Sequence, residues 1–144
     1  MANPRDTVAF DGLASPSDFN TYKIDNSTIT YSSTAANGSA QVGLAVTLSA
    51  DNTIQLVGDG EGVLGKLISV DNQNKAVVQT GGFMELPGGS GATLTRMKAI
   101  VGDLGASSAK GYIREVNTAV AAELGVCRGF IQAPGTASAT VVKL

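Results

Sequence analysis

The chain has 144 residues and a formal net charge of -2; 43% of its residues are hydrophobic and 15% are charged. This length suits one domain with one hydrophobic core, and the composition excludes both an intrinsically disordered chain and a highly charged one. The 10 basic residues are scattered and slightly outnumbered by 12 acidic ones. We therefore expect no nucleic-acid partner, because nucleic-acid binders concentrate lysine and arginine to neutralise phosphates.

The sequence also argues against membrane insertion and secretion. The longest apolar stretches are only a few residues long, whereas a membrane-spanning helix needs about 18 apolar residues. The start MANPRD lacks the apolar region of a secretory signal, so we expect a soluble protein that is made in a cytoplasm. The single cysteine, Cys127, excludes an internal disulfide framework and is predicted to be a buried thiol.

Residues 1–39 lack a regular hydrophobic pattern and are predicted to form an extended N-terminal arm. Aromatic residues recur at intervals among polar ones, and Pro4 and Pro16 oppose a helix. Such a segment cannot form a core alone, but its aromatic side chains can anchor it on its own domain or on a neighbour. The alternative for residues 21–34 is a β-hairpin of the same domain that turns at Asp25 and Asn26. The arm is therefore predicted to be partly a hairpin.

The remaining chain, residues 40–144, is predicted to be a single β domain. From Val42 to Leu48, apolar residues alternate with small or polar ones, which places every second side chain on one face of a sheet. Similar short runs are separated by turn-forming pairs such as Gly81-Gly82 and Pro134-Gly135. This spacing predicts a small antiparallel barrel or sandwich. The predicted strands are residues 42–49, 53–57, 66–70, 75–80, 83–86, 93–101, 111–116, 126–133 and 138–144.

At most one short helix is expected in the chain. Asn117 is a candidate N-cap for residues 118–124, and Gly125 ends the run. A helix of about two turns depends on packing for its stability. The predicted fold class is therefore all-β: a small antiparallel barrel or sandwich with an extended N-terminal arm.

A glycine-rich stretch, residues 60–66 (GEGVLGK), fits two phosphate-binding patterns, GxGxxG and GxxxxGK. Both patterns require that a helix follows the glycines and turns its N-terminus towards the phosphate. Here a β-prone run follows, and Leu67 stands where the phosphate loop needs serine or threonine. Asp59 and Glu61 would also repel an anion. We interpret the stretch as a turn between strands and expect no nucleotide or other cofactor.

The chain is not expected to be an enzyme. It has no histidine, so it lacks the commonest general base, the usual partner of a nucleophilic serine or cysteine, and a common zinc ligand. Glu115 is expected to form cross-strand pairs with Arg128 or Lys98 that fix the strand register. Two carboxylate pairs are interpreted as solvated turn residues rather than as a catalytic or metal site: Asp59 with Glu61, and Asp51 with Asp71.

Along the β domain, strand, glycine, apolar residues and proline follow in succession, and then further strands and a terminal one. The segments are GKLISVD (65–71), KAVVQTGGFMELP (75–87), VCRGFI (126–131) and the terminal ATVVKL (139–144). With the polar arm in front of them and no catalytic residues, they resemble the capsid decoration, or cement, proteins of tailed bacteriophages. The likeness covers most of residues 55–144. It implies a homotrimer rather than a dimer, bound to the outer capsid surface of the virion and touching more than one subunit of the major capsid protein lattice.

The resemblance implies a mechanical function. A protein that binds only the assembled shell stabilises that shell against the pressure of the packaged genome, and several weak contacts per oligomer combine. We hypothesise that residues 1–20 of the arm reach a neighbouring subunit, while the β domain forms the self-interface. The candidate capsid contacts are Arg5, Phe10, Asp11, Phe19 and Tyr22, with Phe10 and Phe19 as the anchors.

Two other functions are compatible with the sequence. One is another virion protein without catalytic activity, such as a tail-tube or fibre-base β protein. The other is a β module that binds a sugar or a small metabolite. Such a module recruits aromatic side chains to its pocket, whereas this chain has no tryptophan and only 5% aromatic residues.

Overall fold

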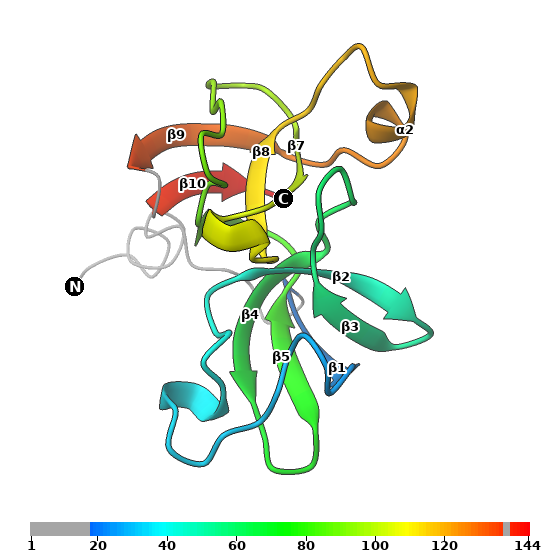
Figure 1. The fold of residues 1–144 in the computed structure, drawn as a ribbon, viewed down its shortest axis with the longest axis vertical. Coiled ribbons are helices and arrows are strands. Elements are labelled where there is room, and N and C mark those ends of the chain that lie inside the picture. Colours follow the sequence, from blue (N-terminus) through cyan, green and yellow to red (C-terminus); the bar gives the residue numbers. More distant parts are fainter. Residues whose placement is uncertain (1–17, 137–138) are drawn as a thin grey trace, which may run out of the picture.

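The structure is a computed structural model that describes residues 18–136 and 139–144. Over these residues it contains ten β-strands and one short α-helix, which confirms the predicted all-β class (Figure 1). The elements are β1 (Phe19–Ile24), β2 (Ala45–Ala50), β3 (Thr53–Leu56), β4 (Gly65–Val70), β5 (Lys75–Gln79), β6 (Phe83–Leu86), β7 (Ile100–Asp103), β8 (Tyr112–Glu115), α2 (Ala121–Leu124), β9 (Phe130–Thr136) and β10 (Ala139–Lys143).

The first five strands close a barrel in the order β1-β3-β2-β4-β5. Strand β1 completes it, because β1 pairs antiparallel with β5 from Phe19 to Lys23 and parallel with β3 at Lys23 and Ile24. All other strand ladders among the described residues are antiparallel, as predicted. Strands β4 and β5 approach closely at Gly65, where a Cβ atom would overlap with the carbonyl oxygen of Gln79.

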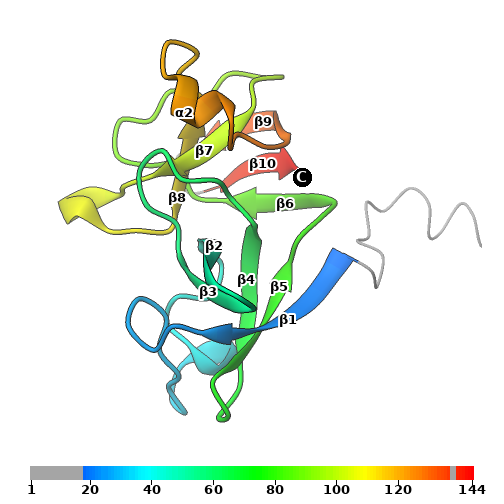
Figure 2. The same cartoon turned by 90° about the vertical axis from the view of Figure 1, so that its right-hand side faces the viewer.

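The second part of the molecule lies above the barrel in Figure 1 and consists of β6 to β10 and α2. Strands β6, β10 and β9 form a three-stranded sheet in that order, and β7 pairs with β8. The chain runs from β5 directly into β6, so β6 lies on the barrel side of its sheet (Figure 2). Side chains alternate between exposed and buried along β6, which is typical of a strand with one face on a core.

Buried apolar side chains form two clusters, where the composition had predicted one core. The first fills the barrel and includes Leu67 and Val78. The second lies in the upper part and includes Ile113 and Ile131. Val57, which directly follows β3 of the barrel, also belongs to it. The expectation of a single core is therefore wrong, because composition sets the amount of apolar surface and the strand connections decide how it is divided.

The predicted boundary between arm and domain is also wrong, since β1 is an integral strand of the barrel. Its side chains alternate so that Ile24 is buried in the barrel and Tyr22 packs against the same cluster. Residues 21–34 do not form the alternative hairpin, because β1 pairs with β5 and β3 instead. The chain reverses at Asp25, whose carboxylate accepts backbone hydrogen bonds from Ser27, Thr28 and Ile29. The rest of the predicted arm, residues 1–17, lies outside the described residues.

Most other strands lie within one to three residues of their predicted bounds. The main exception is the predicted strand 93–101, of which only the end belongs to β7. The backbone turns before it, where Met97 has a positive φ of 67° and the Lys98 N–H donates to the Thr95 carbonyl. The glycine-rich stretch 60–66 leads into strand β4, as predicted.

Two smaller expectations about residues 117–127 differ from the structure. The helix is shorter than predicted, and its N-cap residue is Val120, while the Asn117 side chain accepts a hydrogen bond from the Ala119 N–H. Cys127 is partly exposed instead of buried. No helix in the described ranges, 18–136 and 139–144, combines the length and the apolar character that crossing a membrane requires.

Candidate functional site

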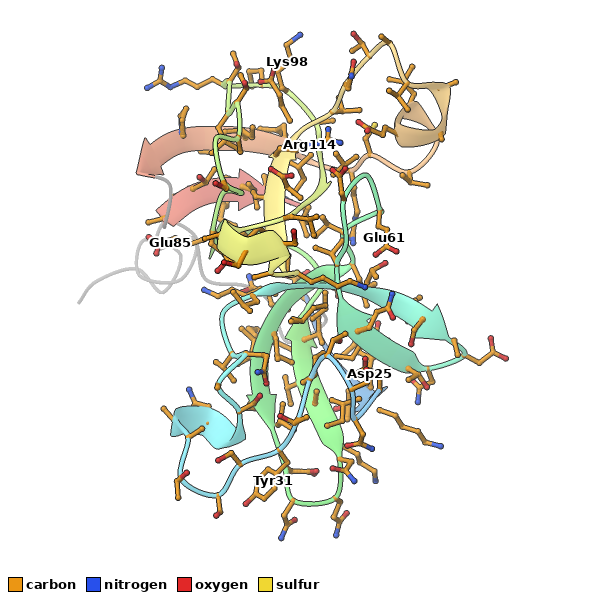
Figure 3. The ribbon with its side chains drawn as sticks, viewed as in Figure 1. Asp25, Tyr31, Glu61, Glu85, Lys98 and Arg114 are labelled. Carbon is orange, nitrogen blue, oxygen red and sulfur yellow. The ribbon has the colours of Figure 1, made fainter. Side chains whose placement is uncertain are left out.

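The most extensive group of charged contacts centres on Arg114 of β8 (Figure 3). Its guanidinium donates two hydrogen bonds to Glu123, from Nη2 to Oε1 over 2.7 Å and from Nη1 to Oε2 over 2.9 Å. Its Nη2 and Nε atoms also donate to Oδ1 of Asp59, over 3.0 and 3.2 Å. A third carboxylate, that of Asp103, lies 3.8 Å from Nε. We call these four residues the Arg114 cluster.

Within the Arg114 cluster, Glu123 is the buried member, with 7% of its surface exposed. Besides the two bonds from Arg114, it accepts a 2.8 Å hydrogen bond from the Asn117 N–H. The hydrogen bonds from Arg114 and then that from Asn117 lower the pKa of Glu123 from 4.5 to about 2. The bond to Glu123 in turn raises the pKa of Arg114. Both groups are therefore charged at neutral pH, and α2 is fixed to β8 by a bidentate ion pair.

The segment that Glu123 fixes carries exposed apolar side chains. We call residues 117–126 the α2 segment; it projects from the edge of the molecule in Figure 1. Val120 and Leu124 are 38% and 49% exposed, and their spacing of four residues places them on one face of the helix. Val126, which follows them, is 46% exposed. The ion pair thus holds a small apolar surface in a defined orientation towards solvent.

A polar pocket of about 520 Å³ adjoins the Arg114 cluster. The loop of residues 90–93 forms one side of it, and Arg114, Glu115 and residues 116–118 form the other. Lys98, which lies above Arg114 in Figure 3, and Asp103 complete its lining. We call it the charged pocket. It has the volume of a small-ligand site, but its lining is richer in charged and polar groups than most such sites.

The predicted capsid contacts are not part of this site. Arg5, Phe10 and Asp11 lie outside the described residues. Tyr22 is half-buried and packs against the barrel core, which leaves it little surface for a partner. Phe19 is exposed at the start of β1, opposite Gln79.

Phe19 shares its corner of the barrel with a second exposed aromatic residue. The Gln79 side chain, opposite Phe19, donates a 2.9 Å hydrogen bond to the carbonyl oxygen of Phe83. Phe83 is itself exposed. This corner lies where the described part of the chain begins.

The predicted pairs of Glu115 with Arg128 or Lys98 are not formed. Arg128 donates instead to the backbone carbonyls of Leu64 and Thr80, over 2.7 and 2.6 Å. Arg114, the neighbour of Glu115, is the residue that forms the ion pairs. Glu123 was not singled out in the sequence, although a lone carboxylate in the apolar run AVAAELGV is a signal for a buried charge with a partner.

Three of the four carboxylates predicted to be solvated turn residues accept hydrogen bonds from other residues. Asp59 is 58% exposed in its side chain and still pairs with Arg114. Glu61 accepts a 2.7 Å hydrogen bond from the Gly58 N–H, and Asp71 accepts from the N–H groups of Gln73 and Lys75. In the described part of the chain, no three metal-ligating side chains are placed to hold a metal ion.

What the site can do follows from these contacts. The charges of the Arg114 cluster are directed at one another, so the cluster fixes the α2 segment and the wall of the charged pocket. Next to the cluster, two surfaces are open to a partner: the apolar face of the α2 segment and the pocket itself. No protein-family model, curated protein or solved structure matches this chain.

Proposed function

We propose that this protein is a structural virion protein that binds the outside of an assembled tailed-bacteriophage capsid and cements neighbouring shell subunits. The observation that carries the proposal is the α2 segment, where the bidentate ion pair of Arg114 with the buried Glu123 holds exposed apolar side chains in place. A surface that is fixed before binding loses little conformational entropy when a partner covers it. This arrangement supports attachment through a preformed surface.

The energy available from this surface suits a cement protein. Complete burial of a leucine or valine side chain contributes about 1.5–3 kcal/mol, so covering a side chain that is half exposed contributes about 1 kcal/mol. One such contact is weak. In a homotrimer, which we propose as the attached form, three copies of the surface bind together, and their effects multiply through effective concentration.

The N-terminal part of the chain supplies the second proposed contact. Residues 1–17, with Arg5, Phe10 and Asp11, continue from the barrel corner where Phe19 and Phe83 are exposed. We propose that this segment extends the attachment to a neighbouring shell subunit. Tyr22 is no longer included, because it packs against the barrel core.

The test measures how much protein sediments with expanded capsids of the phage that produces it. We expect saturable binding of the wild type and weaker binding of Leu124→Ser, by about fivefold per protomer contact and about a hundredfold for a trimer attached through three copies. Leu48→Ser is the matched control, because Leu48 is 51% exposed on β2 and lies outside the α2 segment. Failure of the wild type to sediment with capsids would overturn the proposal.

The contribution of the N-terminal part is tested by a deletion that leaves the barrel intact. Removal of residues 2–17 preserves β1, and we expect it to reduce occupancy on capsids without changing the thermal unfolding temperature. Unchanged occupancy would remove this segment from the mechanism. The molar mass in solution, measured by sedimentation equilibrium, shows whether the protein is already a trimer before it attaches.

A further inference from the structure

The charged pocket contains an unused hydrogen-bond acceptor, which the attachment surface described above does not explain. Glu115 lines the pocket, and its Oε2 atom is buried without a hydrogen-bond partner. Neither oxygen of this carboxylate accepts a hydrogen bond from a described residue, in contrast to Glu123 and Glu61 nearby. Leaving a buried carboxylate oxygen without a donor is costly, so a donor from outside the chain would bind there with a net gain.

The balance of charge around the pocket favours a cationic donor. Lys98 and Arg114 are the cations in its lining, and Asp103 and Glu115 are the carboxylates. Asp59 and Glu123, which pair with Arg114 and are not part of the lining, add two further negative charges. The guanidinium of Arg114 is already occupied by these carboxylates, so it does not compete for Glu115.

Lys98 is the cation of the lining that no described carboxylate pairs with. Its side chain is exposed, and among the described residues it forms no ion pair with Glu115 or with another carboxylate. A flexible ammonium at the rim of the pocket would weaken the binding of a second cation by repulsion and would strengthen the binding of an anion. Removing it therefore changes the affinity in opposite directions for the two kinds of ligand.

We propose that the charged pocket binds a basic side chain, lysine or arginine, of a partner protein, with the Glu115 carboxylate as its acceptor. The terminal torsion of a glutamate side chain is soft, so a small rotation turns Oε2 towards the pocket. The volume of about 520 Å³ admits a lysine or arginine side chain with water around it. This inference rests on the proposed function only for the source of the side chain, a shell subunit.

The test uses small probes in place of the partner, so it does not depend on capsid binding. The isotope-labelled full chain is titrated with the acetylated methylamides of lysine, arginine, norleucine and glutamate, and amide NMR shifts are followed for residues 90–93 and 115–118. We expect the two basic probes to shift these amides and saturate in the millimolar range. The norleucine probe, which has a similar length and no charge, should leave them unchanged.

Two variants decide the sign of the interaction. Glu115→Gln should weaken the binding of the basic probes about tenfold, which is the effect of removing a charged hydrogen-bond partner. Lys98→Gln should strengthen it about threefold, the effect of removing one exposed like charge. Equal shifts with the norleucine probe would overturn the inference. The inference would also be overturned if the glutamate probe bound and Lys98→Gln weakened its binding, since the pocket would then be an anion site.

Discussion

Replacing Glu123 by glutamine tests whether the ion pair with Arg114 holds the α2 segment in place. The variant keeps the shape of the side chain and one acceptor oxygen, but it removes the charge. The pKa of Glu123 falls from 4.5 to about 2 on folding, which at about 1.36 kcal/mol per pH unit corresponds to about 3 kcal/mol of stability. Breaking a fully buried ion pair costs about 3–5 kcal/mol; here the Arg114 side chain is 21% exposed and keeps Asp59 as a partner, so the lower end of this range applies.

The pH dependence gives this prediction a definite sign. Because the folded protein holds the pKa of Glu123 below its unfolded value, the stabilisation is fully present above about pH 4.5 and is lost as the pH falls towards 2. The difference in the free energy of unfolding between wild type and Glu123→Gln should therefore be about 3 kcal/mol at pH 7. It should shrink by about 1.4 kcal/mol per pH unit between pH 4.5 and 2.

The assay is urea unfolding followed by far-ultraviolet circular dichroism, since the chain has no tryptophan. Urea is chosen because it is uncharged and does not screen the ion pair. Glu85→Gln is the matched control: Glu85 is exposed on β6, and its variant should unfold within about 0.5 kcal/mol of the wild type at every pH. A difference for Glu123→Gln that stays constant with pH, or that lies below about 1 kcal/mol at pH 7, would show that the ion pair does not hold the α2 segment in place.

Three further predictions concern the barrel and its surface. Gly65→Ala should lower the free energy of unfolding by more than about 2 kcal/mol, because its Cβ atom would overlap with the Gln79 carbonyl. Gly125→Ala should be neutral or stabilising, because φ is -75° and its Cβ atom would make only ordinary van der Waals contacts; chemical denaturation of both variants checks this, and equal stability of the two would contradict it. Thr28→Val should lower the free energy of unfolding by about 1–3 kcal/mol, because the Thr28 hydroxyl accepts a 2.8 Å hydrogen bond from the N–H of the buried Leu56. Thr28→Ser keeps this oxygen, so an equally large loss for Thr28→Ser would show that the bond is not the cause. Asp25→Ala should lower the free energy of unfolding by about 1–2 kcal/mol at pH 7, and by progressively less as the pH falls through the lowered pKa of Asp25. Burial acts to raise this pKa, but the hydrogen bonds from Thr28, Ile29 and Ser27 more than offset it; a loss of stability that does not decline in acid would argue against this turn.

The strands of the barrel were predictable because their signals are local. Alternation from Val46 onwards and turn residues such as Asn52 and Asn74, which both have positive φ in the structure, determine where strands run and end. The pairing of β1 was not predictable in this way. Its partners are β5, more than 50 residues away, and β3 in a parallel arrangement, and neither pairing leaves a signal near β1.

The candidate site was predictable only in part for the same reason. Ion pairs were predicted for Glu115, whereas Arg114, the residue beside it in the sequence, forms them. The actual partner, Glu123, lies across a turn, and Asp59 lies 55 residues away along the chain. Which carboxylates converge on Arg114 depends on how β8, α2 and the loop before β4 pack together. That packing is a property of the whole fold and leaves no spacing rule in the sequence.

The most direct test of the proposed attachment is an electron cryomicroscopy map of expanded phage capsids incubated with the purified protein. We expect ordered extra density at symmetry axes of the outer surface, into which the barrel fits with the apolar face of the α2 segment turned towards the shell. Bare capsids at saturating protein concentration would contradict it. So would bound protein whose α2 segment points away from every neighbouring subunit.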